Sequence, residues 1–246
     1  MIRPKRAMVL AAGKAVRMRP LTDHTAKPLL RVRGRTLLDH ALDRLAAAGV
    51  EQVVVNAHWC GERVAQHLAE RRDRPRTLVS HEEMLLETGG GVRAALPLLG
   101  DDPFYVVNGD AFWLDGPIPA LHRLAHAFDP RESDSVLLLH RTAQVQADVG
   151  LGDFALDKWG VPRRRAEREV VPYIYAGVHI MSPALLDGMP NGPFSMNLAW
   201  NRALAAGRLR AVVHDGLWFH LSVPADLERA EAELDECGAL VDALPA

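Results

Sequence analysis

A cluster of cations, among them Arg17, Arg19 and Lys27, follows an apolar run near the start of the chain, in the stretch MVLAAGKAVRMRPLTDHTAKPLL at residues 8–30. The run ends at Gly13, which permits backbone shapes that turn successive N–H groups towards phosphate oxygens. Arg17 can bind such oxygens as a fork, and Lys27 supplies a mobile point charge. The loop lacks the GxGxxG pattern, because Ala15 takes the second glycine position, and it is not GxxxxGK[ST]. These residues indicate a triphosphate site, with a solvated turn between a strand and a helix as the alternative.

Carboxylate and amide side chains end the strand-like run VVNGD, which carries Asn108 and Asp110. Mg²⁺ prefers oxygen ligands and often takes only one or two carboxylates, with phosphates and water as its other ligands. Asp110 is therefore a candidate metal ligand, and an ordinary Asn-Gly-Asp turn is the alternative. Asp153, after the glycine turn in GLGDFALD, is either an acceptor for sugar hydroxyls or an amide, or a residue at the edge of a hairpin.

Glycines stand at two further places where a ligand can approach the backbone. Gly89, Gly90 and Gly91 open a predicted helix in LETGGGVRAAL, where a flat base can come close and the helix N-terminus favours anions. The alternative for these three is a flexible loop. Gly177 in YIYAGVHIM either lets a sugar pack on a strand or marks a bulge. The arginines at 163–165 are interpreted as a solvated surface run.

The elements that must position these residues alternate between strand and helix patterns in the first half of the chain. β-Branched runs with little polar alternation are typical of strands covered on both faces, as in parallel sheets. Ligands bind beyond the carboxyl ends of such strands, which favours the loop after the first strand. We predict an α/β fold, a Rossmann-like three-layer sandwich with a mixed, mainly parallel sheet. The expected strands cover 6–12, 51–58, 76–82 and 103–110, and the expected helices 35–49, 61–72 and 88–100.

Shorter strand-like pieces dominate the second half. No linker rich in glycine or serine interrupts the chain, and no hexapeptide array predicts a β-helix. We therefore expect a single domain over residues 1–246, in which residues 111–246 elaborate the site built by residues 1–110. The expected strands cover 134–140, 149–157, 171–181, 208–214 and 216–222, and the expected helices 118–128, 196–207 and 224–244.

The composition excludes several classes of partner. The 246 residues are 48% hydrophobic and 24% charged, which is ordinary for a soluble globular protein. The net charge of −2 provides no whole-protein field for nucleic acid or an anionic membrane, so any anion binding is local. Cys60 and Cys237 lie far apart, which suits reduced thiols, and no run approaches the length of a transmembrane helix. We expect a cytoplasmic protein, and the oligomeric state stays open.

The long motif LAAGKAVRMRPLTDHTAKPLL resembles the signature of the sugar-1-phosphate nucleotidyltransferases, LAAGxGTR[LM]xPLTxxxPKPL. It departs from that signature at Ala15, Val16 and Ala26. The resemblance continues through VVNGD, GDF, YAG and WFHLSVPADL, and so covers most of the chain. It implies the nucleotide-diphospho-sugar transferase type of fold without a C-terminal β-helix. It also implies transfer of a nucleotidyl group from a nucleoside triphosphate to a sugar 1-phosphate, with release of pyrophosphate.

The same resemblance implies a role for each matching position. Residues 1–110 become the nucleotide-binding half and residues 111–246 the sugar-binding half with the C-terminal helix. Arg17, Lys27 and Asp110 are the implied catalytic residues, with Asp110 as the ligand of Mg²⁺, and Asn108, Asp153 and Gly177 are the implied sugar contacts. The implied nucleotide contacts are Ala11, Ala12, Gly13, Lys14, Ala15, Val16, Arg17, Lys27, Glu87, Gly89 and Gly90.

Two local features refine this expectation. The sequence Glu87-Thr88-Gly89-Gly90 resembles the uridylyl members, above all the short ones that act on N-acetylmuramic acid 1-phosphate, and the alternative is a mannose- or heptose-1-phosphate guanylyltransferase. His220 stands where the family commonly has a second metal-binding aspartate. Imidazole is a poor ligand for Mg²⁺ but acceptable to Mn²⁺ or Co²⁺. The site is therefore either active with one carboxylate, or that of a non-catalytic nucleotide or sugar sensor.

Overall fold

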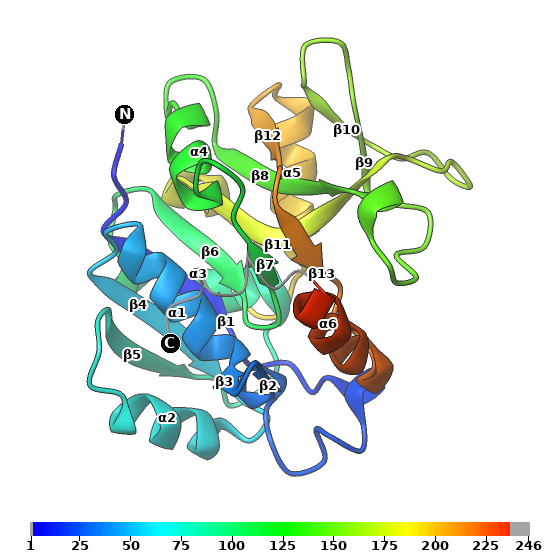
Figure 1. The fold of residues 1–246 in the computed structure, drawn as a ribbon. Coiled ribbons are helices and arrows are strands. Elements are labelled where there is room, and N and C mark those ends of the chain that lie inside the picture. The colour runs from blue at the N-terminus through cyan, green and yellow to red at the C-terminus, as the bar shows by residue number, and fades with distance from the viewer. Residues whose placement is uncertain (1, 237–246) are drawn as a thin grey trace.

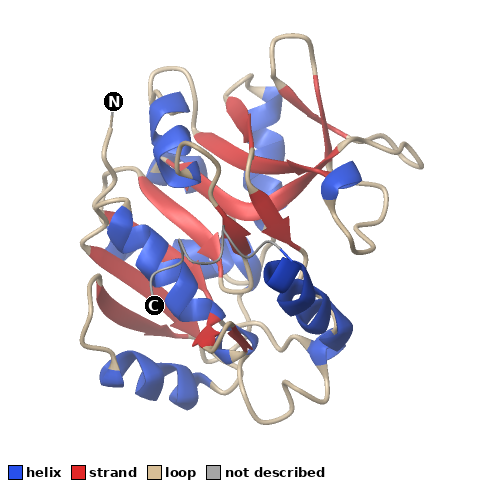
Figure 2. Cartoon of the chain, viewed as in Figure 1, coloured by secondary structure: helices blue, strands red, loops and turns tan. Residues whose placement is uncertain are grey.

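The computed structural model describes residues 2–236 (Figures 1 and 2). Cys237 and the end of the helix expected over residues 224–244 lie outside the described residues. The helices are α1 (Leu37–Ala47), α2 (Gly61–Glu70), α3 (Glu87–Leu99), α4 (Ala120–Ala127), α5 (Met196–Ala205) and α6 (Pro224–Glu236), with short 3₁₀ turns at Val16–Met18, Lys27–Leu29, Thr142–Gln144 and Pro183–Leu186. The strands are β1 (Arg6–Leu10), β2 (Arg31–Val32), β3 (Arg35–Thr36), β4 (Gln52–Ala57), β5 (Arg76–His81), β6 (Phe104–Asn108), β7 (Phe112–Leu114), β8 (Ser135–Arg141), β9 (Phe154–Leu156), β10 (Pro162–Arg164), β11 (Tyr173–Met181), β12 (Leu209–Val213) and β13 (Leu217–Phe219).

β1 lies between β6 and β4 in a nine-stranded mixed sheet and is parallel to both of these neighbours. Leu10, at the end of β1, is in register with Asn56 of β4 and with Asn108 of β6. β5 continues the parallel part beyond β4, and the antiparallel β11 joins the far side of β6. Strands β8, β9, β10 and β12 extend the sheet from β11. The register brings the loops that follow β1, β4 and β6 to one edge of the sheet.

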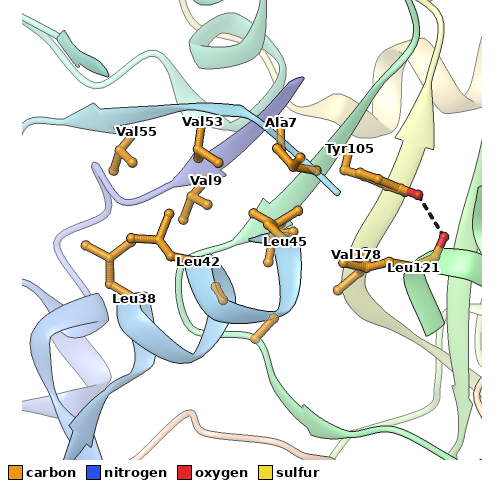
Figure 3. Close-up of a cluster of buried hydrophobic side chains, with 14 of the residues drawn as sticks. Ala7, Val9, Leu38, Leu42, Leu45, Val53, Val55, Tyr105, Leu121 and Val178 are labelled. Atoms are coloured by element: carbon orange, nitrogen blue, oxygen red, sulfur yellow. Dashed lines mark hydrogen bonds between the residues drawn. The ribbon is translucent and has the colours of Figure 1, made fainter. Parts of the chain in front are cut away.

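Helices cover both faces of this sheet, which confirms the predicted three-layer sandwich (Figure 1). Along β1, Ala7 and Val9 pack with residues of α1, α2 and α4, whereas Met8 faces α3 and α5 on the other side. Figure 3 shows the first of these two cores, in which the Tyr105 hydroxyl donates a hydrogen bond of 2.9 Å to the Leu121 carbonyl. Burial raises the pKa of Tyr105, so this hydroxyl stays protonated. No helix within residues 2–236 is long and apolar enough to cross a membrane.

A third, smaller core holds α6 against the two-stranded β7–β13 ribbon. The Asp226 carboxylate, in the first turn of α6, accepts hydrogen bonds from the N–H groups of Ser222 at 2.7 Å and Val223 at 2.9 Å. A carboxylate in the first turn also complements the helix dipole. These contacts fix the segment between β13 and α6, which carries Ser222 to the edge of the sheet.

The start of α1 differs from the prediction, because Arg35 and Thr36 are not helical. They form β3, which pairs with β2 in a short hairpin that the sequence did not predict. Thr36 then caps α1 by accepting a hydrogen bond of 3.0 Å from the Asp39 N–H. The local cap therefore ends the strand and begins the helix at adjacent residues.

Buried histidines make stability depend on pH. Burial and the nearby His214 lower the pKa of His140 to about 4, against 6.5 for an exposed histidine. Between these two values the unfolded chain binds more protons than the folded one, so the free energy of unfolding falls as the pH falls through this window. Each unit of pKa difference contributes about 1.4 kcal/mol.

We expect His140→Gln to lose less stability than wild type between pH 7 and pH 4.5, because it removes one buried group that must take up a proton. Urea unfolding at the two pH values measures the difference. His126→Gln, at an exposed position on α4, is the matched control and should behave like wild type. Equal losses in all three proteins would contradict the assignment.

Candidate active site

The loops at this edge of the sheet enclose a cavity of about 420 Å³. Arg17, Lys27 and Asp110 all line it, which brings together the three predicted catalytic residues from two distant segments. The structure also places most of the predicted nucleotide contacts there. The lining residues are Leu10, Ala11, Ala12, Gly13, Ala15, Val16, Arg17, Met18, Lys27, Pro28, Asn56, Glu82, Leu85, Glu87, Thr88, Asn108, Asp110 and Ser222.

The loop after β1 owes its shape to Ala15. Ala15 stands at a position where the family signature has glycine, and it adopts the left-handed conformation with φ 46° and ψ 47°. It precedes the 3₁₀ turn that carries Arg17. The Thr22 hydroxyl donates a hydrogen bond of 3.0 Å to the Ala15 carbonyl and so holds this turn. The departure from glycine at this position therefore leaves the left-handed turn in place. Lys14, by contrast, is exposed and does not line the cavity.

Lys27 and Asp110 form an ion pair in which Nζ lies 2.5 Å from Oδ2. The Lys27 side chain is 11% exposed and the Asp110 side chain 42%, so the pair reaches from the protein interior to the cavity. The Gly109 N–H donates a hydrogen bond of 2.8 Å to the Leu10 carbonyl, which ties the turn carrying Asp110 to the end of β1. One charge of each sign is thus fixed beside the loop after β1.

Asn56 and Glu82 form a buried polar support beneath this loop. The Asn56 amide accepts a hydrogen bond of 2.7 Å from the Ala11 N–H and donates one of 2.6 Å to Glu82 Oε1. The other Glu82 oxygen accepts from the Leu86 N–H at 3.1 Å, at the entry to α3. Sequence reasoning missed both residues, although a lone asparagine at the end of the apolar strand QVVVNA was a signal.

The glycine run in α3 packs against protein rather than opening a space for a base. The N–H groups of Gly89 and Gly90 both donate to the Phe194 carbonyl, at 2.9 and 3.1 Å. A Cβ atom on Gly89 would lie 2.3 Å from the Phe194 ring, and one on Gly90 would lie 2.4 Å from the Gly192 oxygen. Neither glycine lines the cavity, whereas Glu87 of the same helix does. These glycines therefore allow the close packing of α3, a role that the sequence did not predict.

A second cavity, of about 230 Å³, adjoins the first and shares Leu10, Thr88 and Asn108 with it. Asp153 lies here, where its Oδ2 accepts a hydrogen bond of 2.9 Å from the Tyr175 N–H. The remaining lining residues are Arg164, Tyr175, His179, Ser195, Met196, Asn197 and Trp200. Asn108 therefore stands between two adjoining spaces, one lined by Asp110 and the other by Asp153.

Two of the side chains that line this second cavity, Tyr175 and His179, form an uncharged pair. The Tyr175 hydroxyl lies 2.7 Å from His179 Nδ1. Burial raises the pKa of Tyr175 well above 10 and lowers that of His179 to about 3, so both are neutral at neutral pH. The neutral pair leaves the charge in this space to Asp153 and Arg164.

Gly177 lies behind the site. It has φ +80°, and the pairing of β11 with β8 shifts register between Tyr175 and His179. A Cβ atom on Gly177 would lie 3.3 Å from the Asn108 Cβ. Gly177 lines neither cavity, so the bulge alternative describes its place in the fold.

His220 follows β13 and is half-buried near the charges of the first cavity. Burial lowers its pKa; Lys27 and Arg17 act in the same direction, and Asp226 and Asp110 oppose them. Within residues 2–236 no three His, Cys, Asp or Glu side chains converge as a metal site. Asp110, with one oxygen on Lys27 and a partly exposed carboxylate, fits a cation whose other ligands are phosphates and water.

Comparisons with known proteins find relatives that match most of the chain. A family model described as a MobA-like NTP transferase domain matches residues 7–216. The chain is 43% identical to an N-acetylmuramate alpha-1-phosphate uridylyltransferase of Caulobacter vibrioides, over 95% of this chain and 98% of the relative. A protein of the same name from Neisseria meningitidis serogroup B is 34% identical over 92% and 97%. In fold, the chain resembles the inositol-1-phosphate CTP transferase from T. maritima, with a TM-score of 0.76 and 19% identity over 100% and 99% of the two chains.

We expect Gly90→Ala to lower the free energy of unfolding, because the new Cβ would meet a backbone oxygen that cannot rotate away. Overpacking costs about 1–3 kcal/mol, against a gain of up to about 1 kcal/mol for replacing glycine within a helix. Urea unfolding measures the change. Gly13→Ala, where a Cβ would have no neighbour within 4 Å, is the control. A Gly90→Ala protein as stable as wild type would show that α3 does not need this close packing.

Proposed function

Since this chain belongs to the MobA-like NTP transferase domain family, and so to the nucleotidyltransferases, we propose that it transfers the uridylyl group of UTP to N-acetylmuramic acid 1-phosphate. The products are the UDP-sugar and pyrophosphate, and the proposed role is peptidoglycan recycling. The observation that carries the proposal is the pair of adjoining cavities on either side of Asn108. The substrates follow those named for the relative that is 43% identical.

The first cavity is proposed to hold the triphosphate. Backbone N–H groups near Gly13, Ala15 and Val16 would bind its oxygens, and Arg17 and Lys27 would neutralise the charge that develops on the departing pyrophosphate. Ala11, Ala12 and Glu87 are further proposed nucleotide contacts. Because such transfers depend on positioning and charge neutralisation, no side chain needs to become covalently attached.

The second cavity is proposed to hold the sugar. Asn108 and Asp153 would bind its hydroxyl or amide groups, and Gly177 would act by holding Asn108 in place. A 1-phosphate oxygen directed towards the first cavity would attack the α-phosphorus in line, forming the new O–P bond as the bond to pyrophosphate breaks. This scheme makes residues 1–110 the nucleotide half and residues 111–246 the sugar half of one domain.

Asp110 is the proposed ligand of Mg²⁺, the cofactor we expect. A bound divalent cation would neutralise charge on both substrates' phosphates. Lys27 orients the carboxylate through its 2.5 Å contact. His220 has a lowered pKa and is therefore neutral at neutral pH, which allows its imidazole to accept Mn²⁺ or Co²⁺ as a neighbour.

A cytoplasmic location is part of the proposal. Cys60 is a free thiol, which suits a reducing compartment. UTP, the proposed donor of the uridylyl group, is also found in the cytoplasm.

Lys27→Ala and Asp110→Ala should each lower kcat by about 100-fold or more, because each removes one charge from the reacting region. Pyrophosphate release under saturating substrates measures the loss. Lys5→Ala, which breaks an exposed pair with Glu51, is the control and should keep wild-type turnover. Near-normal rates in either test variant would overturn the mechanism.

The substrate pair is tested by pyrophosphate release from UTP, GTP, dTTP, CTP and ATP, crossed with N-acetylmuramate, N-acetylglucosamine, glucose, mannose and heptose 1-phosphates. Turnover confined to UTP and the muramate would support the proposal. Turnover of GTP with mannose or heptose phosphate would replace it with a guanylyltransferase. Nucleotide binding without turnover of any pair would indicate a sensor.

His220→Asp should increase activity with Mg²⁺ relative to Mn²⁺, because a carboxylate is a harder ligand than imidazole. The ratio of kcat/KM with the two ions measures the effect, after removal of bound metal by chelation. Val223→Ala, in the same segment at an exposed position outside the cavity lining, is the control for local disturbance. An unchanged ratio in a folded His220→Asp protein would place His220 outside the metal's surroundings.

A further inference from the structure

Arg164 is the one cation that lines the second cavity within the described part of the chain. We propose that it binds a carboxylate carried by the sugar and so makes the enzyme select acidic sugars over neutral ones. The proposal rests on the function proposed above and names a specificity-determining residue for it. It also corrects the interpretation of residues 163–165 as a solvated run, because Arg164 is partly buried.

The guanidinium of Arg164 is held in one place by rings and amides. Its Cζ atom lies 4.5 Å from the centroid of the Phe154 ring and 5.7 Å from that of Trp200. Its Nε donates a hydrogen bond of 3.1 Å to Asn201 Oδ1, and Nη2 donates one of 2.6 Å to Asn197 Oδ1. The two amides come from α5, whereas Arg164 ends β10, at the outer end of the sheet (Figure 1). Such stacking and hydrogen bonding preorganise a planar fork for a planar anion.

The charge of Arg164 has no acidic partner within residues 2–236 at ion-pair distance, whereas neighbouring Arg163 pairs with Glu169 at 2.6 Å. Burial lowers the pKa of Arg164, and the charge of Asp153 only partly opposes this. One Asp153 oxygen is already engaged by the Tyr175 N–H. A partly desolvated guanidinium that is hydrogen-bonded only to neutral amides is stabilised when an anionic ligand binds beside it.

Several polar side chains line this cavity besides Arg164. They are Thr88, Asn108, Asp153, Ser195 and Asn197. The cavity therefore suits a sugar with several polar substituents better than an apolar group.

The position of Arg164 separates a carboxylate carried on a sugar substituent from the 1-phosphate. Arg17, Lys27 and Asp110 line the first cavity, and none of them lines the second. Arg164 lines the second cavity only. A sugar that turns its 1-phosphate towards Asp110 presents its other substituents to Arg164. N-Acetylmuramic acid differs from N-acetylglucosamine by a lactyl ether, whose carboxylate is ionised at neutral pH.

The test compares wild type with Arg164→Met, using UTP and either N-acetylmuramate or N-acetylglucosamine 1-phosphate. We expect kcat/KM for the muramate to fall by about 10- to 100-fold, the loss of a charge-assisted hydrogen-bonded pair. Any activity that wild type has with the neutral sugar should stay the same or rise in the variant, and urea unfolding checks that the variant folds. Arg164→Lys keeps the positive charge without the forked hydrogen bonds, so its kcat/KM for the muramate should lie between those of wild type and Arg164→Met. Arg163→Met, at the adjacent exposed arginine, is the matched control.

Each outcome separates this inference from the proposed function. An equal fall with both sugars would show that Arg164 acts on the 1-phosphate or on the fold, and would overturn the inference. An unchanged muramate preference in Arg164→Met would overturn it as well, with the proposed function intact. A wild-type protein that uses a neutral sugar but not the muramate would overturn the proposed substrate and, with it, the role of Arg164.

Discussion

Hydrogen bonding of β1 to a parallel strand on each side determines which residues can meet at the site. The register that aligns Leu10 with Asn56 and Asn108 ends three strands at the same level. The loops that follow these three strands therefore lie at the same edge of the sheet, and segments far apart in the chain line one cavity. A slip of one residue would exchange the two faces of the strand and break both cores.

The Lys27–Asp110 pair illustrates how this edge can hold charge. Removing a lysine from water is costly unless an anion lies beside it, and the carboxylate at 2.5 Å provides that compensation. The pair in turn holds Asp110 in place while leaving much of its side chain accessible. Stability and the proposed chemistry therefore depend on the same contact. Asn56 and Glu82, by contrast, satisfy each other and the backbone beneath the loop.

The sequence predicted the architecture and the main charges of the site because both follow from local patterns. β-Branched runs with little polar alternation located the strands. Strand ends, together with the resemblance to the nucleotidyltransferase signature, singled out Arg17, Lys27 and Asp110. The glycines of α3 were located correctly but explained wrongly, because their neighbours, Phe194 and Gly192, lie about a hundred positions away in the chain. The β2–β3 hairpin was missed because each of its strands has only two residues.

Arg164 shows why a specificity residue is harder to predict than a catalytic one. In the sequence it stands among three consecutive arginines, and nothing local distinguishes it from its neighbours. The alternation of strand β10 turns its side chain towards α5 while Arg163 points to solvent, and only the packing of Trp200 and Phe154 gives that direction a consequence. The phosphate chemistry depends on a loop that a short motif encodes. Selection among sugars instead depends on the contact of two elements that are distant in sequence, so it can change without altering the motif.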